Sequence, residues 1–60
     1  MYRPEEPDEE VETTHGTGNW TGEVGQYGEH YEIDLNQGGI VFLHYEDIKP
    51  AGHRFKFGSA

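Results

Sequence analysis

The feature that most constrains the fold of this chain is its single unbroken apolar run, residues 40–43, with the sequence IVFL. Gly38 and Gly39 precede the run, and Pro50 follows it a few residues later. A run of β-branched, aromatic and aliphatic residues between turn residues is typical of a strand that is buried on both faces. We therefore expect the rest of the chain to supply strands that pack around this one.

Two stretches upstream of the run, 20–24 and 30–35, alternate apolar and polar residues. Alternation of this kind directs one apolar face of a strand toward a core. Residues 36–39, NQGG, have the turn chemistry of a short hairpin, so we expect 30–35 and 40–45 to pair antiparallel. The residues of 30–35 that are expected to face inward are Tyr31, Ile33 and Leu35.

Downstream of the run, residues 46–50, EDIKP, predict a tight turn or one turn of 3₁₀-helix. Ile48 is expected to lie under the small β-barrel that the strands form, and Pro50 is expected to stop further regular pairing. Residues 54–57, RFKF, predict a last short strand with both phenylalanines on one face. Together these patterns favour an all-β fold, a small β-barrel of four to five short antiparallel strands.

The N-terminal segment is dense in carboxylates and poor in apolar residues. Within residues 1–14, Arg3 is the single cation and Val11 the single aliphatic side chain. Such a segment buries too little apolar surface to offset the entropy of ordering it. We therefore predict a disordered acidic tail and linker over residues 1–18 and a β-barrel domain over residues 19–60. The tail either solubilises the domain or docks on a basic surface.

Composition excludes several classes of function. The chain of 60 residues has a formal net charge of −8 at pH 7, which disfavours electrostatic binding of a phosphate backbone. It contains no cysteine, so it has neither a disulfide framework nor a thiolate zinc site. Met1 is followed by YRP and acids, and not by a basic flank with an apolar run. We therefore expect no signal peptide, no membrane span and a cytoplasmic protein.

No catalytic or metal-binding pattern stands out. The four histidines are spread along the chain, and they predict isolated surface residues and not metal ligands. Glu46 and Asp47 are adjacent, so their side chains diverge in an extended segment, and no Ser or Cys nucleophile stands beside a base. We therefore expect no metal, no cofactor and no enzyme.

Four short motifs, taken in order, resemble the strands of an SH3-like barrel of the Tudor and related chromatin-type domains. They are WTGEV at 20–24, YEI at 31–33, IVF at 40–42 and DIKP at 47–50. The resemblance implies an SH3-like barrel over about residues 19–50. Tudor modules hold methylated lysine or arginine in an aromatic cage through cation–π contacts. The positions that the resemblance offers for a cage are Trp20, Tyr27, Tyr31 and Tyr45.

A second resemblance involves residues 39–48, GIVFLHYEDI, which are similar to the V-F-V-H-[FY]-S-x-I strand of cold-shock domains. It implies that Phe42 and His44 stack on single-stranded bases. Where that family has K-G-[FY]-G-F-I, this chain has GEHYEI, with acids in place of the lysine and exposed aromatic. A groove of that sign repels phosphates, which disfavours nucleic acid as a ligand. A fainter resemblance, to type II dihydrofolate reductase, lacks the glutamine of that family's V-Q-I-Y motif.

The sequence favours a non-catalytic protein-binding module, an adaptor or a regulator, that uses an acidic, aromatic-bearing barrel and an acidic tail against a basic partner protein. Single-stranded nucleic-acid binding of the cold-shock type is the alternative, and self-association stays open. Only one face of 40–45 can continue the core. The other face, either Ile40/Phe42/His44 or Val41/Leu43/Tyr45, is expected to be partly exposed as an interface. The expected partner-binding residues are Trp20, Tyr27, Phe42, His44 and Tyr45.

Overall fold

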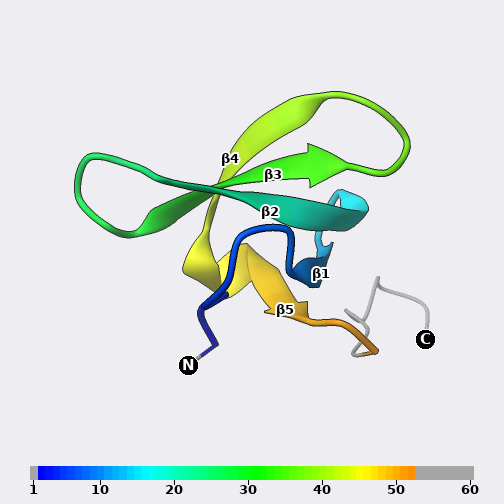
Figure 1. Ribbon diagram of the computed structural model, residues 1–60, viewed down its shortest axis with the longest axis horizontal. Helices are drawn as coiled ribbons and strands as arrows, with labels where there is room; N and C mark the ends of the chain where they lie inside the picture. Colours follow the sequence, from blue (N-terminus) through cyan, green and yellow to red (C-terminus); the bar gives the residue numbers. More distant parts are fainter. Residues whose placement is uncertain (1, 53–60) are drawn as a thin grey trace.

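The computed structural model of the chain describes residues 2–52. These residues form one antiparallel sheet of five strands and one turn of 3₁₀-helix, as the all-β prediction expected (Figure 1). The predicted strand at 54–57 lies outside the described residues. The elements are β1 (Glu10–Thr13), β2 (Gly16–Val24), β3 (His30–Leu35), β4 (Ile40–His44), η1 (Tyr45–Asp47) and β5 (Ile48–Pro50).

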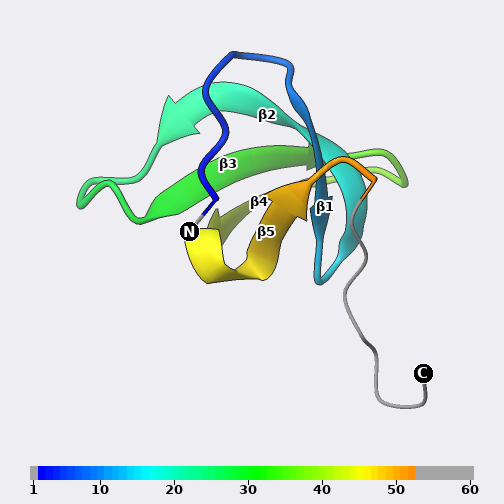
Figure 2. The same cartoon turned by 90° about the horizontal axis from the view of Figure 1, so that it is seen from below.

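The strand order across the sheet is β4-β3-β2-β1-β5, so the first four strands are consecutive neighbours and β5 returns to pair with β1. The sheet is strongly twisted and curled (Figure 2). It is not closed as a barrel, because closure requires the two outermost strands to pair. Among the described strands, β4 pairs with β3 alone, and all three residues of β5 pair with β1.

The first strand corrects the prediction of a disordered tail over residues 1–18. β1 lies inside the sheet, where Val11 is aligned with Gly18 of β2 on one side and with Pro50 of β5 on the other. Val11 and Thr13 are fully buried, and Glu10 and Glu12, which alternate with them, lie on the other face of the strand. Backbone hydrogen bonds on both sides and two inward β-branched side chains hold this acidic segment in the fold. The ordered sheet therefore begins before Asn19.

The core lies on one face of the sheet and draws on every strand. Trp20 and Tyr31 meet edge to face in it, with ring centroids 5.6 Å apart. Gly18 lets β2 and β3 approach closely, because a Cβ at this position would lie 2.7 Å from the carbonyl oxygen of Asp34. The buried hydrophobic residues are Val11, Trp20, Tyr31, Ile33, Leu35, Leu43 and Ile48.

The apolar run is buried on one face only. This corrects its interpretation as a strand buried on both faces and agrees with the expectation that one face of 40–45 is partly exposed. Leu43 is 8% exposed and lies in the core, and Val41 packs against it. Ile40 and Phe42, on the opposite face, are 61% and 51% exposed. The reason is that the described residues form a single sheet, so no second layer among them covers its outer side.

The segment after β4 combines a confirmed prediction with a correction. Tyr45–Asp47 form the predicted single turn of 3₁₀-helix, and Ile48 is buried beneath it, 2% exposed. The correction concerns residues 48–50, which form β5 and not part of the turn. This strand ends at Pro50, where regular pairing was expected to stop. Proline is tolerated in this strand because β5 is an edge, where a missing N–H leaves no ladder hydrogen bond unmade.

Candidate functional site

The exposed face of β4 joins a row of acids on β3. Phe42 is aligned with Glu32, and Ile40 with Asp34, so each exposed apolar side chain lies directly opposite a carboxylate. Directly opposed residues of an antiparallel pair share one face of the sheet, with Cβ atoms about 5 Å apart. We call these four residues the β3–β4 patch. Its composition suits a ligand that carries both apolar and positively charged groups.

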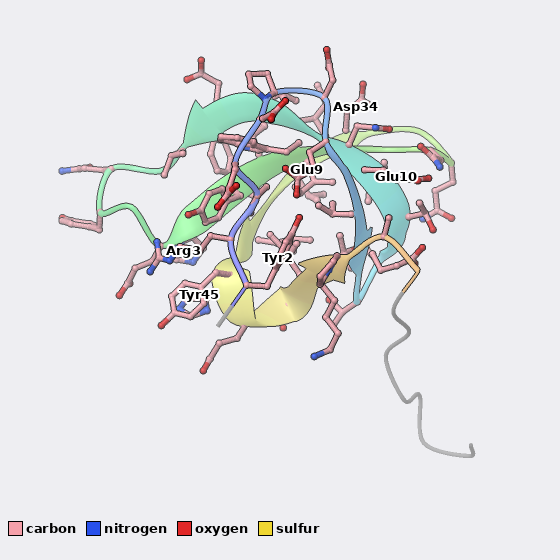
Figure 3. All side chains as sticks on the ribbon, turned by 60° about the horizontal axis from the view of Figure 1, so that its bottom comes forward. Tyr2, Arg3, Glu9, Glu10, Asp34 and Tyr45 are labelled. Atoms are coloured by element: carbon pink, nitrogen blue, oxygen red, sulfur yellow. The ribbon has the colours of Figure 1, made fainter. Side chains whose placement is uncertain are left out.

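One carboxylate of the patch is held in place, and the other is open to solvent. The hydroxyl of Thr21, on β2, donates a hydrogen bond of 2.7 Å to the carboxylate of Glu32. Asp34 is exposed, and Figure 3 labels its side chain on the outer side of the sheet. The patch therefore has one oriented carboxylate beside Phe42 and one free to move beside Ile40.

The backbone of β4 is also available along this edge. At the two ends of the strand, the Gly39 carbonyl accepts from the Leu35 N–H, and the Tyr45 N–H donates to the Glu29 carbonyl. Backbone groups alternate in direction along a strand, so those of the intervening even-numbered residues 40, 42 and 44 point away from β3. No described strand pairs with them. Unpaired groups of this kind can accept an added strand.

The C-terminal end of β4 carries a cluster of rings. The rings of His30 and His44 meet edge to face, with centroids 5.3 Å apart, and His44 lies 4.2 Å from the ring of Tyr45. Nδ1 of His44 accepts a hydrogen bond of 3.1 Å from the backbone N–H of Glu46. The same nitrogen lies 3.6 Å from the Glu46 carboxylate.

A second feature of the molecule is the N-terminal arm, which we define as residues 2–9. The arm runs across β2 and β3 toward η1 (Figure 2). Glu9 fastens it, because its carboxylate accepts hydrogen bonds from the Tyr2 hydroxyl and from the backbone N–H groups of Glu5 and Glu6. Burial, followed by the bond to Glu9, raises the pKa of Tyr2, and the bond from Tyr2 lowers the pKa of Glu9.

Arg3 of the arm reaches a site made by three other parts of the chain. Its guanidinium carbon lies 4.5 Å from the centre of the Tyr45 ring, and Figure 3 shows the two side chains together. Nη1 of Arg3 donates to the Gly28 carbonyl at 2.7 Å and to the Tyr31 hydroxyl at 3.1 Å. We call the Tyr45 ring, the Gly28 carbonyl and the Tyr31 hydroxyl the guanidinium site.

The structure separates the five residues that the sequence predicts for partner binding. Phe42 and His44 lie on the same face of β4, and Tyr45 follows them in contact with His44. Trp20 lies in the core, where its Nε1 donates to the Glu23 carbonyl. Tyr27 is 81% exposed in the loop before β3 and makes no ring contact within residues 2–52.

Three features of the site were missed at the level of sequence. The alternation of 30–35 could have identified Glu32 and Asp34 as neighbours of the exposed face of 40–45. Arg3 carries no such signal, because its partners lie 25 or more residues away in the sequence. A contact of that separation is visible only in the folded chain.

The described residues contain no group of three or more His, Cys, Asp or Glu side chains that could hold a metal ion. Within residues 2–52, no helix has the length and apolar character needed to cross a membrane. Comparison of the chain with protein-family models, with curated proteins and with solved structures found no match.

Proposed function

We propose that this protein is a non-catalytic protein-binding module that uses the β3–β4 patch to hold a basic, partly apolar segment of another protein. The observation that carries the proposal is the pairing of exposed Ile40 and Phe42 with Asp34 and Glu32 across one sheet edge. Exposed apolar side chains in contact with one another mark interaction surfaces on small proteins. Carboxylates beside them select a partner of positive charge.

Charge also decides between a foreign partner and a second copy of the chain. Two copies that met at this patch would bring Glu32 and Asp34 of both chains together, and like charges at an interface are costly. The formal charge of −8 adds a general repulsion between copies. A basic partner has neither cost, so it is the favoured occupant.

We also infer that the curled sheet is of the SH3-like kind. The support is the return of β5 to β1 after a single 3₁₀ turn, together with the bend that β2 makes between Trp20 and Val24. Gly22 lies in this irregular stretch with a φ of +104°, a conformation that glycine adopts without strain. Small sheets of this kind host many functions, so the function is argued from the patch alone.

Binding of a short labelled peptide in which lysine alternates with valine tests the proposal. We expect binding that weakens as salt is raised, because part of the attraction is electrostatic. Phe42→Ala is expected to weaken binding about tenfold, which corresponds to about 1.4 kcal/mol for an aromatic anchor. Asp34→Asn should weaken it less. Glu10→Gln removes the same charge from β1 and serves as the matched control.

Two results count against the proposal. One is wild-type affinity in the Phe42→Ala protein, and the other is equal weakening by Glu10→Gln and Asp34→Asn, which would mean that net charge alone attracts the peptide. A labelled single-stranded oligonucleotide, titrated at low salt, addresses the cold-shock alternative. We expect no binding, because the carboxylate opposite Phe42 repels phosphates.

A further inference from the structure

The guanidinium site holds a cation without a carboxylate. Arg3 meets an aromatic face, a carbonyl oxygen and a hydroxyl oxygen, and no ion pair to it occurs among the described residues. All three groups are neutral, so they recognise the shape and the donors of the guanidinium as well as its charge. We propose that the guanidinium site binds an arginine side chain of the partner protein, and that Arg3 is its intramolecular competitor. This inference rests on the proposed function for the class of partner.

The site is complete without the N-terminal arm. Tyr31 belongs to β3, is 5% exposed and packs against Trp20, so its ring is held by the core. The Gly28 carbonyl is fixed in the turn before β3, where the Gly28 N–H bonds to the Gly25 carbonyl at 2.9 Å. Tyr45 lies in η1 and stacks against His44. Because core, turn and 3₁₀ helix fix these groups, removal of Arg3 leaves a preorganised site.

The arm is held to the sheet by side chains, since Tyr2 packs against the core and Arg3 binds the guanidinium site, and hardly at all by its backbone. From Tyr2 to Pro7 no backbone hydrogen bond joins it to a strand within the described structure, and the first such bond comes from the Asp8 N–H to the Trp20 carbonyl. Pro4 is buried, but Arg3 is exposed, and the Glu9 carboxylate that fastens the arm belongs to the arm itself. Terminal segments with few sheet contacts open at low free-energy cost.

Position connects this site to the β3–β4 patch. Tyr45 directly follows β4 and stacks on His44, whose side chain ends the face that carries Phe42. The Tyr45 ring therefore lies one residue beyond the end of β4, next to the end of the face that carries the patch. Glu5 and Glu9 also line the groove around Arg3, but both belong to the arm and leave the site with it.

The chemistry favours arginine over lysine. A planar guanidinium can stack on the Tyr45 ring and still direct N–H groups to two acceptors in its plane. The ammonium of lysine is a compact, strongly hydrated charge with no flat face to stack. The Gly28 and Tyr31 oxygens would then be satisfied less well, so the site should discriminate between the two cations.

The experiment is a titration of the full chain with N-acetyl-arginine amide, followed by the amide shifts of Gly28 and Tyr45. A competitor in the same chain raises the apparent dissociation constant by the inverse of its open fraction. Arg3→Ala should therefore bind the probe at least about threefold more tightly than wild type. Lys49→Ala, which removes a cation from β5, is the charge-matched control and should leave the constant at its wild-type value. N-acetyl-lysine amide should bind Arg3→Ala less tightly than the arginine probe does.

A second variant distinguishes binding at the guanidinium site from nonspecific electrostatic attraction of a cationic probe to the acidic chain. Tyr31→Phe keeps the ring in the core and removes only the hydroxyl acceptor, so in the Arg3→Ala background it should weaken arginine binding and leave lysine binding unchanged. Equal affinity of wild type and Arg3→Ala for the arginine probe overturns the proposal, and so does an equal gain from Lys49→Ala. If Arg3→Ala does not fold, the same comparison is made with Arg3→Lys, which must bind the arginine probe more tightly than wild type.

This titration is independent of the test of the patch. The probe is too small to reach Phe42, so loss of peptide binding in Phe42→Ala leaves its result unchanged. Failure of the proposed function and failure of the arginine site are therefore distinguishable.

Discussion

The hydroxyl of Tyr2 donates a hydrogen bond to the carboxylate of Glu9, and this bond closes the N-terminal arm into a loop. The same carboxylate accepts the backbone N–H groups of Glu5 and Glu6. Burial and then the bond to Glu9 raise the pKa of Tyr2, and the bond from Tyr2 lowers the pKa of Glu9. Arg3 lies between the joined residues, so closure of the loop also positions its guanidinium.

Closure of the arm should depend on pH in two windows. The pKa of Glu9 is lowered from its ordinary value of 4.5, so its contribution is present above about 4.5 and is lost as the pH falls through the folded value. The pKa of Tyr2 is raised from 10.0, so its contribution is present below about 10 and is lost as the pH rises further. We expect the arm to open at both extremes, as measured by the NMR signals of the Arg3 side chain.

Tyr2→Phe provides the control for this prediction. It removes the hydroxyl, so the alkaline opening should disappear, and the Glu9 carboxyl should titrate closer to its ordinary value. A Glu9 carboxyl in the wild-type chain that titrates at or above 4.5 would contradict the hydrogen bond.

Leu43 and Phe42 are neighbours in sequence with different expected costs of truncation. Leu43→Ala empties a core position and should cost about 2–5 kcal/mol in the free energy of unfolding, a large share of what so small a domain holds. Phe42→Ala removes a ring that is half exposed, so it should cost about 1 kcal/mol. Chemical denaturation measures both. Equal costs for the two variants would mean that the outer face of β4 is covered.

Gly18→Ala tests the close approach of β2 and β3. The new methyl group would lie 2.7 Å from both the Asp34 carbonyl oxygen and Cγ2 of Ile33, closer than side chains can come. The strands must separate, and we expect a loss of at least about 2 kcal/mol by denaturation, the range for overpacked cores. Gly25→Ala is the comparison, because its nearest neighbour is 3.3 Å away and the neighbour is a side-chain carbon of His30. A loss at Gly25 as large as that at Gly18 would refute this account.

The contrast between β3 and β1 indicates how far sequence reasoning reaches. In β3, Tyr31, Ile33 and Leu35 alternate with polar residues. The alternation and the composition both indicate a half-buried strand, and the strand predicted over 30–35 is confirmed. In β1, Val11 and Thr13 alternate with glutamates, but the acidity of the whole segment outweighed the alternation. An inward threonine is also weak evidence for a buried strand. In the structure, the hydroxyl of Thr13 is satisfied locally, because it donates to the Gly16 carbonyl.

The apolar run and the candidate site show a second limit of prediction from the sequence. The strand predicted for residues 40–43 is confirmed. Composition does not state which face of a strand is covered, so the sequence predicted that one of two faces is exposed and could not identify it as the face of Ile40 and Phe42. Phe42, His44 and Tyr45 follow from the pattern of one strand. The Arg3 contact depends on how the sheet curls, which no local pattern contains.

The role of β1 leads to a prediction about truncation. A fragment of residues 19–60 corresponds to the domain expected from composition, but it lacks β1 and the first part of β2. Without β1, β5 loses its only described partner strand, and Ile48 loses the neighbour that covers it in the sheet. We expect this fragment to be unfolded, with an undispersed proton NMR spectrum, because it loses the fully buried Val11 and Thr13, and so small a domain has little stability to spare.

A matched fragment that begins at residue 8 separates the strand from the arm. It keeps β1 and the hydrogen bonds that join Asp8 and Glu9 to Trp20, and it lacks Tyr2 and Arg3. This fragment should fold, with a lower melting temperature than the full chain, because Glu9 loses its bond from Tyr2 and the groove loses its cover. A folded 19–60 fragment would show that β1 is dispensable. Failure of both fragments would instead show that the arm is part of the core structure, and that Arg3 is not free to leave its site.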